Sequence, residues 1–195
     1  MVNFSLWKDA FLKPKEIFQK EKTNASIKEG VANILTASVI ISVLLSIAVI
    51  ILGSVGASLM PGFAMFAGAG VVLSIIFIFL FFIIGELIGS FINVGIIWII
   101  AKLLGGNGSF EQQYYLTSLF TAPLLVLLVL NVIPLIGTLI FALIALYSIY
   151  LLYLVVKQVH GLSTVKTLLS IFLIPIILII LMIIIFGIVM VKSSV

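Results

Sequence analysis

The stretch that decides the fold occupies residues 71–104 and reads VVLSIIFIFLFFIIGELIGSFINVGIIWIIAKLL. Glu86 and Lys102 are its only charged residues. As one helix it would be about 50 Å long, which exceeds the hydrocarbon core of about 30 Å, yet two separate spans need about 20 residues each. The stretch is therefore either one long tilted helix or two spans that start around Phe63 and hinge near Gly85.

The composition of the whole chain is that of a membrane protein. Of its 195 residues, 64% are hydrophobic and 8% are charged, whereas a soluble domain has about 45–50% apolar and about 25% charged residues. So few charges cannot cover the surface of a water-soluble enzyme, and the high hydrophobicity excludes intrinsic disorder. We therefore expect an all-α fold, a polytopic transmembrane helical bundle.

The distribution of lysine decides between the two interpretations of residues 71–104. All ten basic residues of the chain are lysines. With five spans, nine of them lie on the side of the N-terminus and only Lys192 lies on the other side, whereas six spans give seven and three. The positive-inside rule favours five spans and a cytoplasmic N-terminus. The expected spans are 31–53, 71–104, 112–131, 134–157 and 165–191.

Residues 1–30 precede the first span and differ from it in composition. Apolar side chains, among them Trp7 and Phe11, recur between lysines at roughly helical spacing. This pattern is typical of a helix in the headgroup region and equally of a helix packed on the cytoplasmic face of its own protein. We expect two parts, a cytoplasmic or interfacial amphipathic segment over residues 1–30 and a five-span membrane domain over residues 31–195.

Glu86 is the most distinctive side chain of the long stretch. In the five-span topology it lies about 18 Å along the helix from Trp98, near the middle of the bilayer. Its ionised form is costly at that depth, so we expect a neutral carboxyl group and a candidate functional site. Ser90 and Asn93 share its helix face and complete a polar stripe. The same stripe is also expected if Glu86 only locks the packing of the bundle.

Two glycines beside this stripe have the spacing of a helix-packing motif. Gly85 and Gly89 form a G-x-x-x-G pair, which allows a second helix to approach closely. The stripe and the pair together predict a proton or cation site, a polar groove that contacts lipid, or a packing contact. If residues 71–104 form two spans, Glu86 lies in a turn and this hypothesis lapses.

A glycine-rich loop follows the same stretch on the cytoplasmic side. Ser109 has capping-box spacing to Gln112, which predicts the start of a helix. No lysine–hydroxyl pair follows the glycines, so the loop is not a Walker A motif and a tight turn is the simpler interpretation. As a candidate partner contact, the loop comprises Gly105, Gly106, Gly108, Ser109 and Phe110.

Sets of residues that carry catalysis or bind metals are missing from the sequence. The chain has no cysteine, one histidine (His160) and one aspartate (Asp9), so zinc sites, thiol chemistry and aspartyl dyads are excluded. No basic patch is interleaved with aromatic residues for nucleic-acid binding. We expect no enzyme activity, metal or cofactor. The expected partners are membrane lipids, with a protein partner or a second copy of the chain as further candidates.

The order of short motifs along residues 5–190 resembles the Yip-domain family, five-span membrane proteins named for their interaction with Ypt/Rab GTPases. Each motif is short, and the resemblance depends on their order and spacing. They are Phe11-x-x-Pro14-x-x-x-Phe18, Leu104-Gly105-Gly106-x-Gly108-Ser109-Phe110, Ala122-Pro123, Ile133-Pro134-x-x-Gly137 and His160-Gly161-Leu162-Ser163-x-x-Lys166.

The resemblance implies a five-helix bundle with a cytoplasmic N-terminus, and in eukaryotic members a role in vesicle trafficking. This chain lacks the Asp-Leu-Tyr-Gly-Pro element of those members and looks like the compact prokaryotic form, which implies a cell-membrane location. Our leading hypothesis is a non-enzymatic membrane protein that binds lipid or protein partners and organises the membrane locally. The alternative is a small proton- or ion-coupled transporter or channel subunit that uses Glu86.

Overall fold

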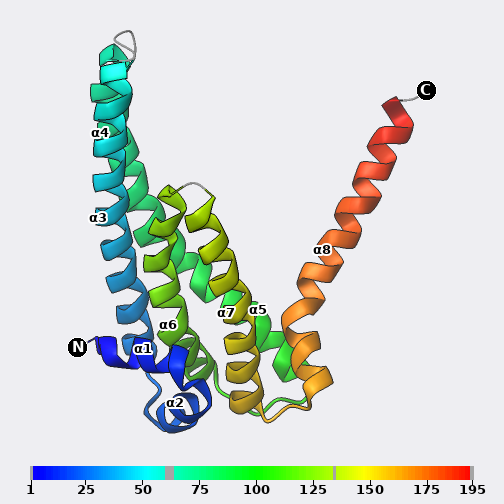
Figure 1. The fold of residues 1–195 in the computed structure, drawn as a ribbon. Helices are drawn as coiled ribbons and strands as arrows, with labels where there is room; N and C mark the ends of the chain where they lie inside the picture. The colour runs from blue at the N-terminus through cyan, green and yellow to red at the C-terminus, as the bar shows by residue number, and fades with distance from the viewer. Residues whose placement is uncertain (1, 60–63, 134, 194–195) are drawn as a thin grey trace.

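The chain forms an all-helical bundle in the computed structural model, which describes residues 2–59, 64–133 and 135–193. Five of its helical segments are long and apolar enough to cross a membrane. The expected polytopic helical fold is therefore confirmed (Figure 1). The elements are α1 (Phe4–Leu12), α2 (Pro14–Glu21), η1 (Lys22–Asn24), α3 (Ile27–Leu59), α4 (Ala64–Leu80), η3 (Phe81–Gly85), α5 (Glu86–Leu103), α6 (Phe110–Leu127), η4 (Leu128–Val132), α7 (Ile136–His160) and α8 (Thr164–Ser193).

The long apolar stretch is one continuous helical path without a loop. α4, η3 and α5 follow one another directly from residue 64 to residue 103. η3 is a π-helical turn, in which the backbone N–H of Glu86 donates to the carbonyl oxygen of Phe81, five residues earlier. The single-helix interpretation is therefore correct, and Glu86 lies within a helix rather than in a turn between two spans.

The N-terminal helices α1 and α2 pack on the polar end of the bundle. The indole N–H of Trp7 donates to the side-chain oxygen of Asn33 at 3.0 Å. Phe18 is fully buried, and its ring centroid lies 6.3 Å from that of Phe120. Lys22 Nζ donates to two carbonyl oxygens at the end of α7. Of the two expected roles for residues 1–30, packing on the protein's own bundle is present.

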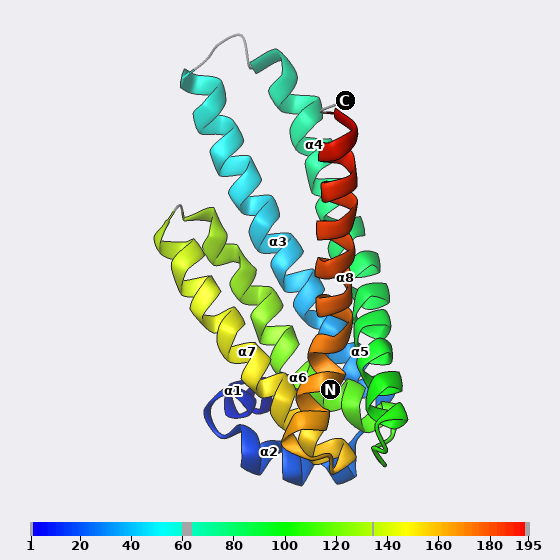
Figure 2. The same cartoon turned by 90° about the vertical axis from the view of Figure 1, so that its right-hand side faces the viewer.

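The hydrophobic core lies between these N-terminal helices and α3, α6 and α7. α6 makes its most extensive packing with α3, and Figure 2 shows the α3–α4 hairpin extending beyond the turn that joins α6 to α7. Capping determines where α6 begins, because Ser109 and Gln112 form the predicted capping box. Fully buried core side chains include Phe18, Ile34, Ile41, Leu116, Leu119, Leu151 and Val155.

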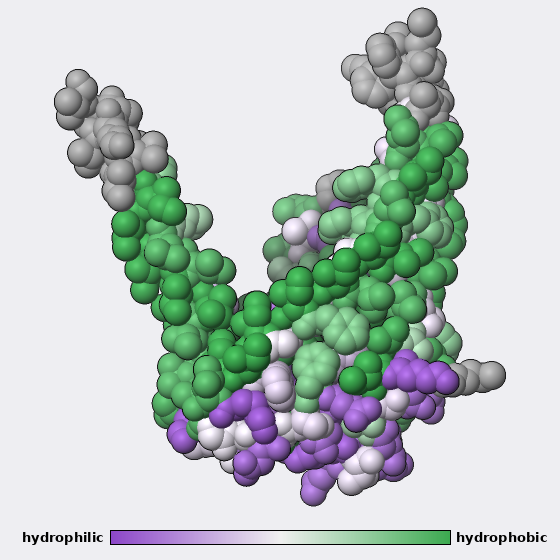
Figure 3. All heavy atoms as spheres, turned by 180° about the vertical axis from the view of Figure 1, so that it is seen from behind, coloured by the Kyte–Doolittle hydropathy of each residue, from purple (hydrophilic) through white to green (hydrophobic). Residues whose placement is uncertain are grey.

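α8 diverges from the rest of the bundle. It packs against α5 and α7, and Figure 1 shows the gap to those helices widening towards its C-terminal half. Nearly all side chains of residues 172–186 are exposed and apolar. In Figure 3 the hydrophilic residues gather at the end that carries the N-terminal helices, and hydrophobic residues cover the arms that rise from it. The surface is therefore divided as a membrane protein requires.

Candidate functional site

The polar stripe of α5 lines a cavity of about 360 Å³ between helices. α6 supplies the opposite wall, and α3, η4 and α7 contribute one apolar residue each. Both the stripe and the opposite wall contain hydroxyl groups, so a largely apolar cavity contains several polar groups, and all its walls come from candidate membrane spans. The lining residues are Ile34, Glu86, Gly89, Ser90, Asn93, Val94, Thr117, Thr121, Leu124, Leu125, Leu128 and Phe141.

The π-helical turn sets the direction in which the stripe faces. A π-turn contains more residues than an α-helical turn, so it rotates every later residue relative to the helix before it. α5 begins immediately after this turn with Glu86. Ser90 and Asn93 follow at α-helical spacing and therefore share its face. The sequence predicted this shared face but gave no sign of the π-turn.

Hydroxyl groups of the cavity differ in whether they have a partner. Ser90 Oγ donates to the carbonyl oxygen of Leu87 at 2.8 Å and lies 3.1 Å from the hydroxyl oxygen of Tyr114. Thr121 Oγ1 donates to the carbonyl oxygen of Thr117 at 3.0 Å. The Thr117 side chain is only 6% exposed, and its hydroxyl has no hydrogen-bond partner among the described residues. The hydroxyl is thus enclosed and unpartnered beside the cavity that Thr117 lines.

The predicted close contact at Gly85 and Gly89 is absent from the described residues of a single chain. A Cβ added at Gly89 would meet nothing within 4 Å, and one at Gly85 would meet only the ring of Phe81 on its own helix. Gly89 lines the cavity instead. The motif leaves space beside Glu86 because the neighbouring helices stand back from it, which the spacing of the glycines could not indicate.

The glycine-rich loop packs tightly against the end of α7. Gly106 and Gly108 are buried, and a Cβ on either would overlap Val159 or His160. The backbone N–H of Asn107 donates to the carbonyl oxygen of His160 at 3.2 Å. Gly105 has a φ of 95°, which favours glycine. Close packing therefore explains Gly106 and Gly108, and the positive φ explains Gly105.

Phe110 and its aromatic neighbours anchor the other end of the loop. Its ring stacks on Phe91 and Tyr114, with centroid distances of 6.0 and 5.7 Å. The indole N–H of Trp98 donates to the carbonyl oxygen of Gly108. Phe110 is half-buried, whereas Ser109 is exposed. Of the residues expected to contact a partner, only Gly105 and Ser109 are fully on the surface.

A buried pair that the sequence did not indicate joins α6 to α7. His160 Nε2 lies 2.7 Å from Gln113 Oε1, and both side chains are buried. Gln113 Nε2 in turn donates to the carbonyl oxygen of Val94 on α5. Lys166 donates to the carbonyl oxygen of Leu104. The histidine motif and the glycine-rich loop, far apart in the sequence, thus form one cap at the polar end of the bundle.

The chemistry available at these sites is binding and proton exchange. Within the ranges that the structure describes, no group of three or more histidine, cysteine, aspartate or glutamate side chains could hold a metal ion. Glu86 is the ionisable group of the intramembrane cavity, and the hydroxyl and amide groups around it can donate and accept hydrogen bonds.

Comparison with known proteins connects this architecture to one family. The family model described as the Yip1 domain matches residues 8–186, which includes the second half of α1, all of α2 and most of α8. No curated protein and no solved structure matches the chain. The match covers the loop, the buried histidine and the five apolar helices together. The chain therefore belongs to the Yip1-domain family.

Proposed function

We propose that this protein is a non-enzymatic integral membrane protein that binds lipid in the cavity beside Glu86. The main support for this proposal is that Glu86 on α5 and the unpartnered hydroxyl of Thr117 on α6 line one cavity within candidate membrane spans. Polar groups at that depth cost free energy unless a partner forms hydrogen bonds with them, because water is scarce there. A bound lipid supplies the missing hydrogen-bond partners.

Access to the cavity is from the side, where the acyl chains are. Gly89 and Asn93 line the cavity and are exposed on a candidate span. Apolar residues of α6, η4 and α7 form the remaining walls. A volume of about 360 Å³ lies within the range of small-ligand sites. It suits the ester region of a lipid and the first part of a chain, while the rest stays in the bilayer.

The hydrogen-bond donors of the cavity favour a ligand that carries hydrogen-bond acceptors. A neutral carboxyl group on Glu86 and the free hydroxyl on Thr117 are both donors, and the amide of Asn93 adds a third. Ester carbonyl oxygens accept hydrogen bonds and have no donor of their own. Glycerolipid esters therefore match the cavity better than a free cation, for which a neutral carboxyl provides no counter-charge.

The orientation of the bundle supports a cytoplasmic N-terminus. Nine lysines belong to residues 8–28 or to the ends of α5, α7 and α8 that lie at the same end of the bundle, and Lys192 lies near the far end of α8. By the positive-inside rule that lysine-rich end faces the cytoplasm. We place the protein in a prokaryotic cell membrane, where a protein partner or a second copy would contact the exposed α8 or Ser109.

The test is retention of glycerolipid by the full-length protein in mild detergent, measured by native mass spectrometry. Glu86→Leu and Thr117→Val each remove a donor, and each should lower occupancy by about tenfold or more, the value of a hydrogen bond in a dry site. Thr138→Val is the matched control because Thr138 is exposed on α7, outside the cavity lining.

Glu86→Gln separates lipid binding from the alternative of coupled transport. Glutamine keeps a neutral donor, so this variant should retain lipid. A proton-coupled transporter needs a group that can release its proton, so Glu86→Gln would abolish flux in liposomes. Flux that disappears in Glu86→Gln, together with equal lipid occupancy in Glu86→Leu and the native protein, would reject our proposal in favour of transport.

A further inference from the structure

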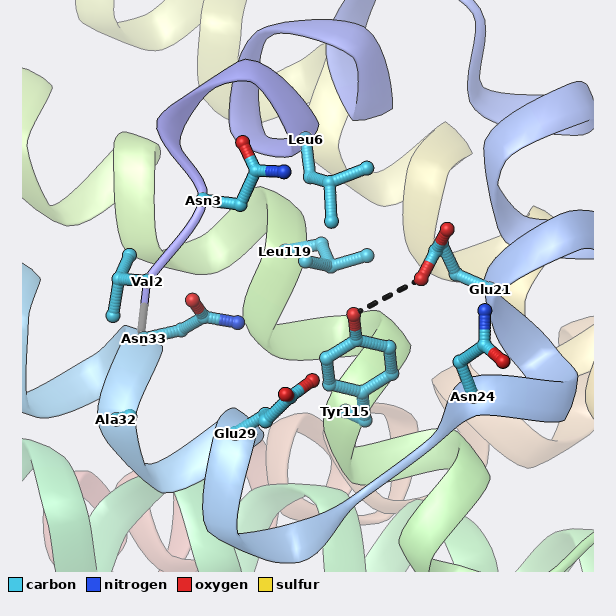
Figure 4. A pocket seen from close by; sticks show the side chains of 10 residues that line it. All are labelled: Val2, Asn3, Leu6, Glu21, Asn24, Glu29, Ala32, Asn33, Tyr115 and Leu119. Atoms are coloured by element: carbon cyan, nitrogen blue, oxygen red, sulfur yellow. Dashed lines mark hydrogen bonds between the residues drawn. The ribbon is translucent and has the colours of Figure 1, made fainter.

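A second cavity, of about 320 Å³, lies at the polar end of the bundle where the N-terminal helices meet α3 and α6. Figure 4 shows side chains from all these segments directed into it. Among the residues that the structure describes, no lysine lines it, although the N-terminal segment is rich in lysine. The lining residues are Val2, Asn3, Leu6, Glu21, Asn24, Glu29, Ala32, Asn33, Tyr115 and Leu119.

Glu21 is the buried acid of this cavity. Its side chain is only 7% exposed, and one carboxylate oxygen, Oε2, accepts a hydrogen bond from the Tyr115 hydroxyl at 3.2 Å. The described residues provide no other hydrogen-bond donor and no cation for this carboxylate. A buried carboxylate without a counter-charge is costly. Its other oxygen is free to bind a positively charged molecule.

A second carboxylate and several amides face the same space. Glu29, in the first turn of α3, lies across the Tyr115 hydroxyl from Glu21 (Figure 4). The amide oxygen of Asn24 is a further acceptor at the rim, whereas that of Asn3 already accepts hydrogen bonds from the backbone N–H and the hydroxyl of Ser5. Val2, Leu6, Ala32 and Leu119 form an apolar wall on one side.

We propose that this cavity binds a primary ammonium group. Three N–H donors on one cation match the two carboxylates and the amide oxygen of Asn24. The apolar wall suits the methylene carbons attached to such a nitrogen rather than a hydrated metal ion. A quaternary ammonium has no N–H to donate and favours a cage of aromatic rings, whereas Tyr115 is the one aromatic residue in the described lining.

The primary ammonium can belong to an ethanolamine phospholipid or to a free amine. The cavity lies at the polar end of the apolar spans, where headgroups lie. It is separate from the cavity beside Glu86, because no residue lines both. The two proposals therefore fail or succeed independently.

The test is the thermal stability of the full-length protein in detergent at pH 7 with ethanolamine, choline or calcium chloride. In nanodiscs, phosphatidylethanolamine is compared with phosphatidylcholine. Ethanolamine or its phospholipid should raise Tm, and choline and calcium should not. Stabilisation by free ethanolamine alone identifies a soluble amine as the source, and stabilisation by the phospholipid identifies the headgroup.

Glu21→Gln tests the role of the charge. The amide still accepts the hydrogen bond from Tyr115, so the fold should be retained. Because an uncompensated charge is removed, Tm without amine should stay equal or rise, while amine affinity falls about tenfold or more. A residue that only supports the fold would show the opposite, a lower Tm with an unchanged amine response. Glu16→Gln, on an exposed position of α2, is the matched control.

The outcomes that overturn the proposal are distinct. They are equal stabilisation by choline and ethanolamine, stabilisation by calcium alone, no stabilisation by either form of ethanolamine, and an unchanged amine response in Glu21→Gln. If Glu21→Gln does not fold, Glu29→Gln provides the same test, because Glu29 is exposed at the start of α3.

Discussion

Alanine substitution at Gly106 should destabilise the protein, whereas the same substitution at Gly89 should not. A Cβ on Gly106 would lie 2.6 Å from His160 Nδ1 and 2.8 Å from both the carbonyl oxygen of Ala101 and His160 Cβ. Two of these three atoms belong to backbone or to a Cβ and cannot rotate away. Overpacking of this kind costs about 1–3 kcal/mol.

Gly89→Ala, the control, should instead stabilise the protein. A Cβ on Gly89 meets nothing within 4 Å, and within a helix alanine is favoured over glycine by about 0.4–1 kcal/mol. At about 2–4 °C per kcal/mol for a chain of this size, Gly106→Ala should lower Tm by about 2–12 °C. Gly89→Ala should raise it by about 1–4 °C.

The assay is thermal unfolding of both variants in the same detergent, followed by tryptophan fluorescence. Unchanged Tm in Gly106→Ala, with loss of a reproducible pull-down partner, would refute the packing role and restore the loop as a contact surface. A lower Tm in Gly89→Ala would show that a second helix, from another copy of the chain, occupies the space beside Gly85 and Gly89.

Two further predictions concern the cap at the polar end of the bundle and the topology. Gln113→Leu removes the partner of His160 Nε2 and should lower the free energy of unfolding, measured by chemical denaturation, by about 1–3 kcal/mol. Gln19→Leu, at an exposed position of α2, is the control and should leave the denaturation midpoint unchanged. Equal midpoints for both variants would contradict the role of the buried pair. Asn107 and Asn131 are both exposed, and single cysteines at these positions should react with an impermeant maleimide from opposite sides of the membrane. Labelling of both from one side would reject the five-span topology.

The sequence by itself determined the features that depend on composition and on neighbours along the chain. Apolar length and the sparse charges identified the membrane helices, and the distribution of lysine identified residues 71–104 as one helical path. The capping box at Ser109 was predicted for the same reason, because its two hydrogen bonds join residues three positions apart. The shared helix face of Glu86 and Ser90 followed from helical periodicity alone.

Only the tertiary structure decided which faces meet. It brought Thr117 to the wall opposite Glu86, paired Gln113 with His160, and enclosed Glu21, at the end of α2, against α6. Apolar spans in lipid show no sharp difference between buried and outward faces, because both are hydrophobic. Periodicity therefore could not indicate how α5, α6 and α7 rotate about their axes or how closely they approach. Those rotations, together with the π-turn before Glu86, are set by side-chain packing between residues distant in sequence, and they determine where polar groups gather.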